Sequence, residues 1–234
     1  MVQVLLLHGL AGKPAVWDPM IAALPDGVEV TNVEQPWHGM SDGTWAHHPD
    51  PVRLVVDAVR PEHDVVVAHS FGATLLAEAY ADGRVPARPS VLLCPFHRSS
   101  SAEFDWSTIS YYLNDFHRTF EEAMRVGETA RFPERRRAWL ARALRDQVGP
   151  YGWMRWFETY LRSPFLDFSG VGAPQLVLSG VDDIAARPED GRALAKSLPH
   201  GRFELLDGCG HFPMLEQPDR VAALIRDFLD DAWS

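Results

Sequence analysis

The sequence contains few cysteines and no excess of basic residues, and both shortages exclude classes of protein. Cys94 and Cys209 are the 2 cysteines in 234 residues, and neither belongs to a His/Cys spacing typical of a metal site. We therefore expect free thiols in a cytoplasmic protein that holds no metal. The formal net charge of −10 and a pI near 5.4 argue against nucleic acid or an anionic membrane as a partner, because both favour a basic patch.

Long apolar runs and phosphate-binding loops are also missing. No stretch approaches the roughly 20 apolar residues that a membrane-spanning helix needs. The chain enters a predicted strand at Val2 without the basic region and apolar segment of a secretory signal, which again favours the cytoplasm. The glycine-rich segment 9–14 lacks the Walker spacing, and Pro14 stands where a phosphate-binding helix would start. We expect no nucleotide, no organic cofactor and no membrane partner.

Short apolar runs alternate with helical patterns along most of the chain, which is typical of a parallel sheet covered on both faces. The predicted strands are Val2–Leu7, Glu29–Val33, Asp64–Ala68, Ser90–Leu93, Gln175–Leu178 and Gly201–Leu206. Prolines at the start of helical patterns predict helices over Val52–Val59, Glu189–Leu198 and Asp219–Asp231. The expected fold class is α/β, a mostly parallel, doubly wound sheet of about six strands with helices on both faces.

Between residues 97 and 170 the alternation stops, and only helical patterns are found. They predict helices over Trp106–Phe116, Phe120–Val126, Arg135–Val148 and Gly152–Leu161. More than half of the aromatic residues of the chain fall in this segment. The rings either form the core of a thin helical lid or line an apolar pocket above the sheet, and the sequence leaves both open. We expect a core of residues 1–96 and 171–234, with a helical lid inserted at 97–170.

The most informative local pattern surrounds Ser70. A run of β-branched residues over 65–67 ends at Ala68, and a helical pattern follows Ser70 at once. A strand, a sharp turn and a helix would place the Ser70 hydroxyl at the carboxyl edge of the sheet, near the positive end of the helix. The small residues Ala68 and Gly72 suit a tight turn. On its own this serine is as easily an ordinary strand-end residue as a nucleophile.

Three further features fall at the carboxyl ends of predicted strands, where open α/β sheets place their sites. His211 lies in a glycine-rich loop between the last strand and the last helix. Asp182 and Asp183 follow the fifth strand, where an aspartate also suits a turn or a helix cap. The segment His8-Gly9 closes the first strand, and glycines there leave backbone N–H groups exposed. The joint occurrence of these features is far less expected by chance than any one of them.

Together these segments resemble the α/β-hydrolase superfamily, in its helical-lidded form, from Val2 to Trp233. The resemblance depends on the His8-Gly9 loop, Trp17, the segment 36–41, the turn at Ser70, Gly180-x-x-Asp183 and Gly210-His211. The sequence departs from the family pattern at Ala68, which replaces a glycine, and at Trp37, which would narrow the site entrance. It also lacks the antiparallel strands that often precede the first parallel one.

The resemblance implies roles for individual residues. Ser70 would be the nucleophile, His211 its general base and Asp183 the orienting acid, with Asp183 preferred to Asp182 because the family spacing is Gly-x-x-Asp. The oxyanion would be bound by the backbone N–H groups of Leu10 and Phe71. Histidines at positions 8, 38 and 69 are more consistent with structural roles than with catalysis. A substrate pocket is expected to include the aromatic residues Trp37, Tyr111, Trp153, Trp156 and Phe212.

The leading functional hypothesis is a serine hydrolase that cleaves a carboxylic ester or thioester with an apolar acyl group through an acyl-enzyme. The alternative is a lyase, acyltransferase or cyclase of a biosynthetic pathway that uses the same triad. A ligand-binding module with an intact triad is a third possibility that no residue specifically favours. The expected partner is a small apolar substrate, and the expected state is a monomer or homodimer.

Overall fold

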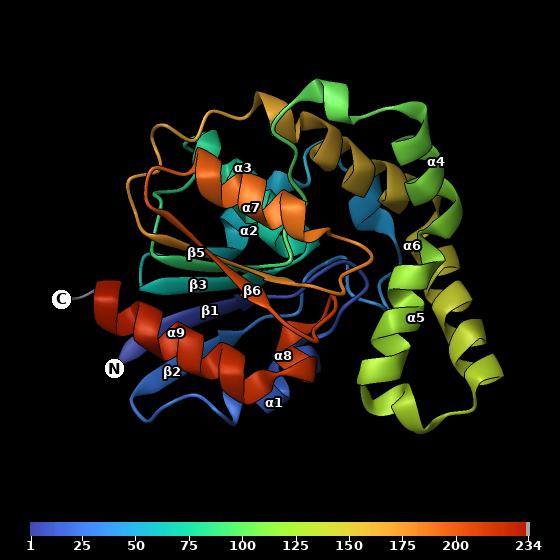
Figure 1. The fold of residues 1–234 in the computed structure, drawn as a ribbon, viewed down its shortest axis with the longest axis horizontal. Coiled ribbons are helices and arrows are strands. Elements are labelled where there is room, and N and C mark those ends of the chain that lie inside the picture. Colours follow the sequence, from blue (N-terminus) through green and yellow to red (C-terminus); the bar gives the residue numbers. More distant parts are fainter. Residues whose placement is uncertain (233–234) are drawn as a thin grey trace.

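A computed structural model describes residues 1–232 as one parallel sheet with helices on both faces (Figure 1). The six strands lie in the order β2-β1-β3-β4-β5-β6, and each neighbouring pair is parallel. They span β1 Val2–Leu7, β2 Val28–Asn32, β3 Val65–His69, β4 Ser90–Leu93, β5 Gln175–Gly180 and β6 Gly201–Leu206. The predicted fold class is confirmed. Trp233, the last residue of the family resemblance, lies outside the described residues.

The strands form because their apolar residues are needed on both faces of the sheet. In β1, Leu5 and Leu7 point into one apolar core, whereas Val4 and Leu6 point into the other. The central strand β3 is buried along its whole length, as its run of β-branched residues predicts. Strand β2 begins and ends one residue earlier than predicted, because Val28 pairs with Val2 of β1.

Two sets of helices cover the sheet (Figure 1). One face carries α2 Val52–Ala58, α3 Phe71–Ala81 and α7 Pro188–Ser197. The other face carries α1 Asp18–Ile21, α8 Pro213–Glu216 and α9 Pro218–Ala232. Within the described residues, no helix is both long enough and apolar enough to cross a membrane.

The remaining helices lie between β4 and β5 in the chain and stand beside the sheet in Figure 1. They are α4 Trp106–Asp115, α5 His117–Val126 and α6 Glu134–Arg162. Helix α6 is interrupted at Gly149 (φ 64°, ψ 177°), directly before Pro150, which is why the sequence pattern predicts two helices there. We keep the term lid for residues 97–170. The division of the chain into a core and a lid at these boundaries stays a prediction.

A buried polar cluster joins the two ends of the lid to the core. The Arg98 guanidinium donates to the Tyr160 hydroxyl (2.6 Å), which donates to the carboxylate of Asp190 in α7 (2.6 Å). The backbone N–H of Arg98 also donates to the Ser163 hydroxyl (3.0 Å). Burial raises the pKa of Asp190 to about 7, against the opposing effect of the Arg98 charge. This cluster fixes the lid where the chain enters and leaves it.

Candidate active site

Ser70 occupies a sharp turn between β3 and α3. Its backbone lies at φ 54° and ψ −120°, a left-handed region that residues other than glycine rarely adopt. The turn brings the following helix against the first strand, since a Cβ atom at Gly72 would lie 2.8 Å from the carbonyl oxygen of His8. The methyl group of Ala68 is fully buried in β3, so the turn accommodates alanine at this position.

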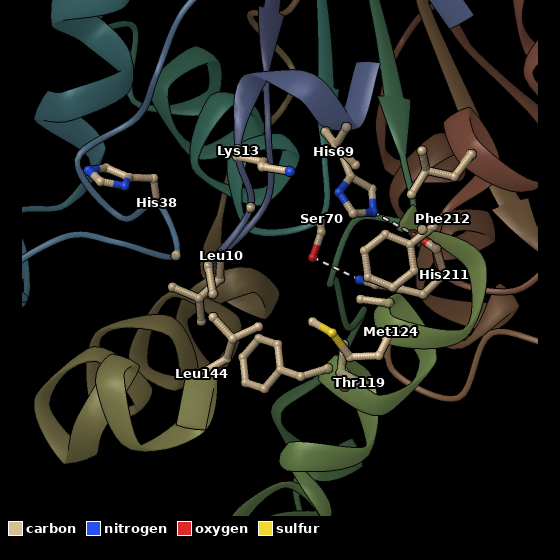
Figure 2. A pocket seen from close by; sticks show the side chains of 18 of the residues that line it. Leu10, Lys13, His38, His69, Ser70, Thr119, Met124, Leu144, His211 and Phe212 are labelled. Carbon is tan, nitrogen blue, oxygen red and sulfur yellow. Dashed lines mark hydrogen bonds between the residues drawn. The ribbon is translucent and has the colours of Figure 1, made fainter. Parts of the chain in front are cut away.

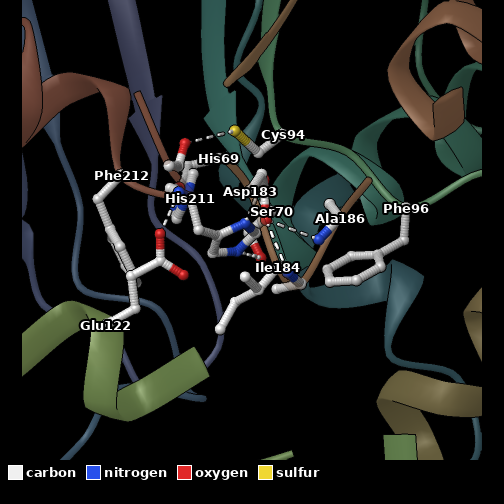
Figure 3. A network of polar contacts seen from close by, with 12 residues as sticks. His69, Ser70, Cys94, Phe96, Glu122, Asp183, Ile184, Ala186, His211 and Phe212 are labelled. Carbon is white, nitrogen blue, oxygen red and sulfur yellow. Dashed lines mark hydrogen bonds and ion pairs between the residues drawn. The ribbon is translucent and has the colours of Figure 1, made fainter. Parts of the chain in front are cut away.

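His211 stands between Ser70 and Asp183 (Figure 3), and Figure 2 shows its contact with Ser70. Its Nε2 lies 2.9 Å from the Ser70 hydroxyl oxygen, and its Nδ1 lies 2.8 Å from the Asp183 carboxylate. An ionised carboxylate only accepts hydrogen bonds, so Nδ1 carries the proton and donates to Asp183. Nε2 is then free to accept the proton of the Ser70 hydroxyl. The structure therefore brings together the three side chains singled out in the sequence.

Of the two aspartates in the loop after β5, Asp183 contacts His211 and Asp182 does not. One oxygen of Asp183 faces His211, and the other accepts the backbone N–H groups of Ala185 (2.8 Å) and Ala186 (2.9 Å). Asp182 is exposed, and its backbone N–H donates to the Cys209 carbonyl. Gly180 permits this arrangement, because a side chain there would collide with the carbonyl oxygens of the loop that carries His211.

The surroundings of His211 favour the charged imidazole. Burial alone would lower the pKa of His211, but the Asp183 carboxylate, its hydrogen bond, Glu122 and Glu216 together raise that pKa above its ordinary value of 6.5. An imidazolium formed by proton transfer from Ser70 is thereby stabilised. The site can hold a proton on His211 at the moment when a serine attacks.

The other histidines near Ser70 bind the backbone. His8 accepts the Gln35 N–H at Nε2 (3.0 Å), so its Nδ1 carries the proton and donates to the Gly9 carbonyl (2.9 Å). Burial lowers the pKa of His8 to about 4. The His69 ring donates from Nε2 to the His211 carbonyl (2.7 Å), and burial holds the pKa of His69 well below its ordinary value. His38 lies at the cavity wall, and its Nε2 is 3.9 Å from a carboxylate oxygen of Glu34.

A mostly apolar cavity of about 410 Å³ opens beside Ser70 and His211 (Figure 2). Residues of the lid and of the first loop form much of its wall, among them Leu10, Phe116, Phe120, Met124, Leu144 and Trp156, and Phe212 adds to it from the loop after β6. The wall also includes polar residues at one side, namely Lys13, Glu34 and His38. Trp156 and Phe212 thus lie where the sequence analysis expected pocket residues.

Three other expected pocket residues, Trp37, Tyr111 and Trp153, lie outside the cavity lining, which corrects that expectation. The indole of Trp37 is buried and donates to the His8 carbonyl (3.1 Å). The Tyr111 hydroxyl donates to the Ile184 carbonyl (2.5 Å). Trp153 donates to the Tyr112 carbonyl (3.1 Å) and stacks on Phe157. Each ring packs against the protein where its polar atom finds a backbone partner.

The two residues expected to bind an oxyanion lie close to Ser70. Leu10 contributes to the cavity wall beside Ser70, and Phe71 begins α3 immediately after Ser70. Backbone N–H groups in the first turn of a helix have no partner within the helix, so such a position suits an anion. Their role as oxyanion donors stays a prediction.

Cys94, Asp183 and His211 place possible metal-binding atoms within 4.8 Å of one another. Asp183 and His211 already share a hydrogen bond, and burial raises the pKa of the Cys94 thiol well above its ordinary value. A protonated thiol is a poor metal ligand. The arrangement of Cys94, Asp183 and His211 therefore suits the hydrogen bond between Asp183 and His211 better than a bound metal ion. Both cysteines are free and buried.

Sequence reasoning missed two carboxylates at the loop that carries His211. Glu216 accepts the backbone N–H groups of Gly210 and Phe212 (both 2.9 Å), and Glu122 accepts that of His211 (2.8 Å) (Figure 3). Glu216 lies four residues after Phe212, a spacing that could have indicated a local contact. Glu122 is far from His211 in the sequence and lies in an ordinary charged helix, so no local pattern points to it.

Comparison with known proteins places the chain in a family. The model of the alpha/beta hydrolase family matches residues 4–224. A pimeloyl-[acyl-carrier protein] methyl ester esterase of Aromatoleum aromaticum is 26% identical over 96% of this chain and 97% of its own length. An esterase of the same name from Nitrosospira multiformis is 24% identical over 97% of this chain and 94% of its own length.

Solved structures show the same fold. A meta-cleavage product hydrolase from Pseudomonas fluorescens superposes with a TM-score of 0.68, at 17% identity, over 99% of this chain and 92% of that protein. The family match covers nearly the whole chain and includes Ser70, Asp183 and His211. The chain therefore belongs to the alpha/beta hydrolase family and is a hydrolase.

Proposed function

We propose that this hydrolase cleaves a carboxylic ester or thioester with an apolar acyl group, using Ser70, His211 and Asp183 as its catalytic triad. One observation carries the proposal: the continuous chain of hydrogen bonds from the Ser70 hydroxyl through His211 to Asp183 at the cavity wall. A serine hydroxyl is almost fully protonated at neutral pH, so it needs a base at this distance when it attacks.

In the proposed reaction, Ser70 Oγ attacks the carbonyl carbon while its proton moves to His211 Nε2. Asp183 keeps the imidazole in the required tautomer and stabilises its charged form. The backbone N–H groups of Leu10 and Phe71 bind the oxyanion, and the loss of one such donor typically costs about 3–4 kcal/mol. His211 returns the proton to the leaving alcohol or thiol. Water, activated by His211, then releases the acid and regenerates Ser70.

The cavity supports the choice of acyl group. Its wall is mainly apolar beside Ser70, and the lid contributes rings and aliphatic side chains to it, including Phe116, Phe120 and Leu144. An acyl chain in contact with these residues would be removed from water, which favours binding by about 0.8 kcal/mol per buried methylene. The two relatives named as methyl ester esterases support an ester as the substrate.

A panel of p-nitrophenyl esters and acyl-CoA thioesters of increasing chain length tests the proposal. We expect kcat/KM to rise with chain length until the cavity is filled, and we expect no turnover by Ser70→Ala. Product analysis by mass spectrometry should find the free acid. Acyl products transferred to an added alcohol or amine in preference to water would instead support an acyltransferase. Turnover by Ser70→Ala at the wild-type rate would refute the proposal.

A further inference from the structure

Three consecutive backbone N–H groups at the catalytic histidine loop are bound by carboxylates from two different parts of the chain. Glu216 of α8 accepts the first and the third, at Gly210 and Phe212. Glu122 of α5 accepts the middle one, at His211 itself, at 2.8 Å (Figure 3). Glu216, in the core, thus binds the backbone on both sides of His211, and Glu122, in the lid, binds the backbone of His211 itself.

The environment of Glu122 makes this contact an unusual one. One oxygen accepts the His211 N–H, whereas the other is buried and has no hydrogen-bond partner among the described residues. Burial raises the pKa of Glu122, against the opposing effects of His211 and of its hydrogen bond. A buried oxygen without a partner destabilises the fold. Glu122 therefore differs from a solvated surface carboxylate, because one of its oxygens binds the His211 backbone and the other is buried.

The charged groups around Glu122 come from three elements. His211 lies on the loop before α8, Glu216 lies on α8 itself, and Asp183 lies on the loop after β5. Asp183 and Glu216 disfavour the ionised form of Glu122, whereas His211 favours it. A negative Glu122 in turn favours the imidazolium of His211. The two side chains are therefore electrostatically linked.

Helix α4 of the lid binds the loop that carries Asp183. The hydroxyl of Tyr111 donates to the Ile184 carbonyl (2.5 Å), and that of Tyr112 donates to the Ala185 carbonyl (2.9 Å). The N–H of Ala185 is in turn bound by Asp183. Helices α4 and α5 thus contact the two loops that carry the acid and the base.

We infer that Glu122 is a positioning residue for His211, so that the triad is fully aligned only while the lid is docked on the sheet edge. The inference depends on the proposed function for its effect on catalysis. His211 must keep Nε2 at hydrogen-bond distance from Ser70 and Nδ1 at hydrogen-bond distance from Asp183. Its backbone is held on one side by Glu122 through the N–H and on the other by His69 through the carbonyl.

Three variants of α5 test the inference. Glu122→Ala removes both the acceptor and the charge, and we expect it to lower kcat about tenfold with KM changed less than about twofold. Glu122→Gln keeps an acceptor oxygen without the charge. It should retain most of kcat, while the pKa on the acid side of the kcat/KM profile moves down. Glu121→Ala, on the same helix and paired with His117, is the control and should match the wild type.

Hydrogen exchange gives a readout that does not depend on activity. We expect the amide exchange of segment 209–212 to become faster in Glu122→Ala and to stay unchanged in Glu121→Ala. Unchanged exchange together with unchanged kcat and pH profile in Glu122→Ala would overturn the inference. If the alanine variant does not fold, the pH profile of Glu122→Gln decides. If the wild type turns over no ester, the proposed function fails, while the exchange comparison still decides the role of Glu122.

Discussion

The imidazole of His69 donates a hydrogen bond to the backbone carbonyl of His211, with 2.7 Å between Nε2 and the oxygen. The residue before Ser70 therefore holds the backbone of His211 in place. A carbonyl only accepts hydrogen bonds, so the proton of His69 is on Nε2. Burial holds the pKa of His69 well below its ordinary value, which makes this ring a poor proton acceptor for Ser70.

Replacing His69 should impair catalysis through the position of His211. In His69→Ala the buried carbonyl of His211 loses its donor, which typically costs about 1–3 kcal/mol. If that cost appears as misalignment, kcat falls about tenfold for every 1.4 kcal/mol. Steady-state kinetics at saturating ester measures the loss. A variant with wild-type kcat would show that this hydrogen bond has no part in aligning the base.

The two neighbouring aspartates should respond very differently to substitution. Asp183→Asn keeps the shape of the side chain but favours the wrong imidazole tautomer, and we expect kcat to fall by roughly 10⁴-fold. Asp182→Asn changes an exposed side chain and should leave kcat within about twofold of the wild type. Both are measured with the same ester at the same pH. Equal small losses at the two positions would contradict the assignment of Asp183.

The pH profile should report the environment of His211. The base must be neutral to accept the Ser70 proton, so activity is lost as the pH falls through the His211 pKa. Because the surrounding carboxylates raise that pKa above 6.5, the acid limb of kcat/KM should be centred above pH 6.5. A titration of kcat/KM from pH 5 to pH 9 locates the limb. A midpoint below 6.5 would show that burial outweighs the carboxylates.

The strand pattern and the meeting of Ser70, Asp183 and His211 could be predicted because they depend on local signals. Apolar runs define the strands, and Ser70, Asp183 and His211 each follow one of them. The order of parallel strands then brings the three loops to one edge of the sheet. The same local reasoning found the interruption of α6 near Gly149 and Pro150.

The cavity wall could not be predicted in the same way, because it depends on which direction each aromatic ring faces. Trp37 and Trp153 are as aromatic as Trp156, yet their indole N–H groups bind backbone carbonyls and hold the rings away from the cavity. Glu122 was missed for a similar reason. Its partner, His211, is close only after the lid has packed against the sheet, and no sequence spacing encodes that contact.

The cluster at the base of the lid should contribute to stability. Above the Asp190 pKa of about 7, Arg98→Met leaves the fully buried carboxylate of Asp190 without its cation, and breaking such a pair typically costs about 3–5 kcal/mol of unfolding free energy. Urea unfolding followed by circular dichroism measures the change. Adding Asp190→Asn to that variant removes the unpaired charge and should recover part of the loss. Full stability in Arg98→Met alone would show that Asp190 is neutral or otherwise compensated.

Labelling with a fluorophosphonate tests whether Ser70 is an activated nucleophile, because the reagent reacts with a serine only when a base activates it. Intact mass and peptide mapping then identify the modified residue. We expect one label per chain, on Ser70, with no label on Ser70→Ala and much slower labelling of His211→Gln. A label on another residue, or equal labelling of Ser70→Ala, would contradict it.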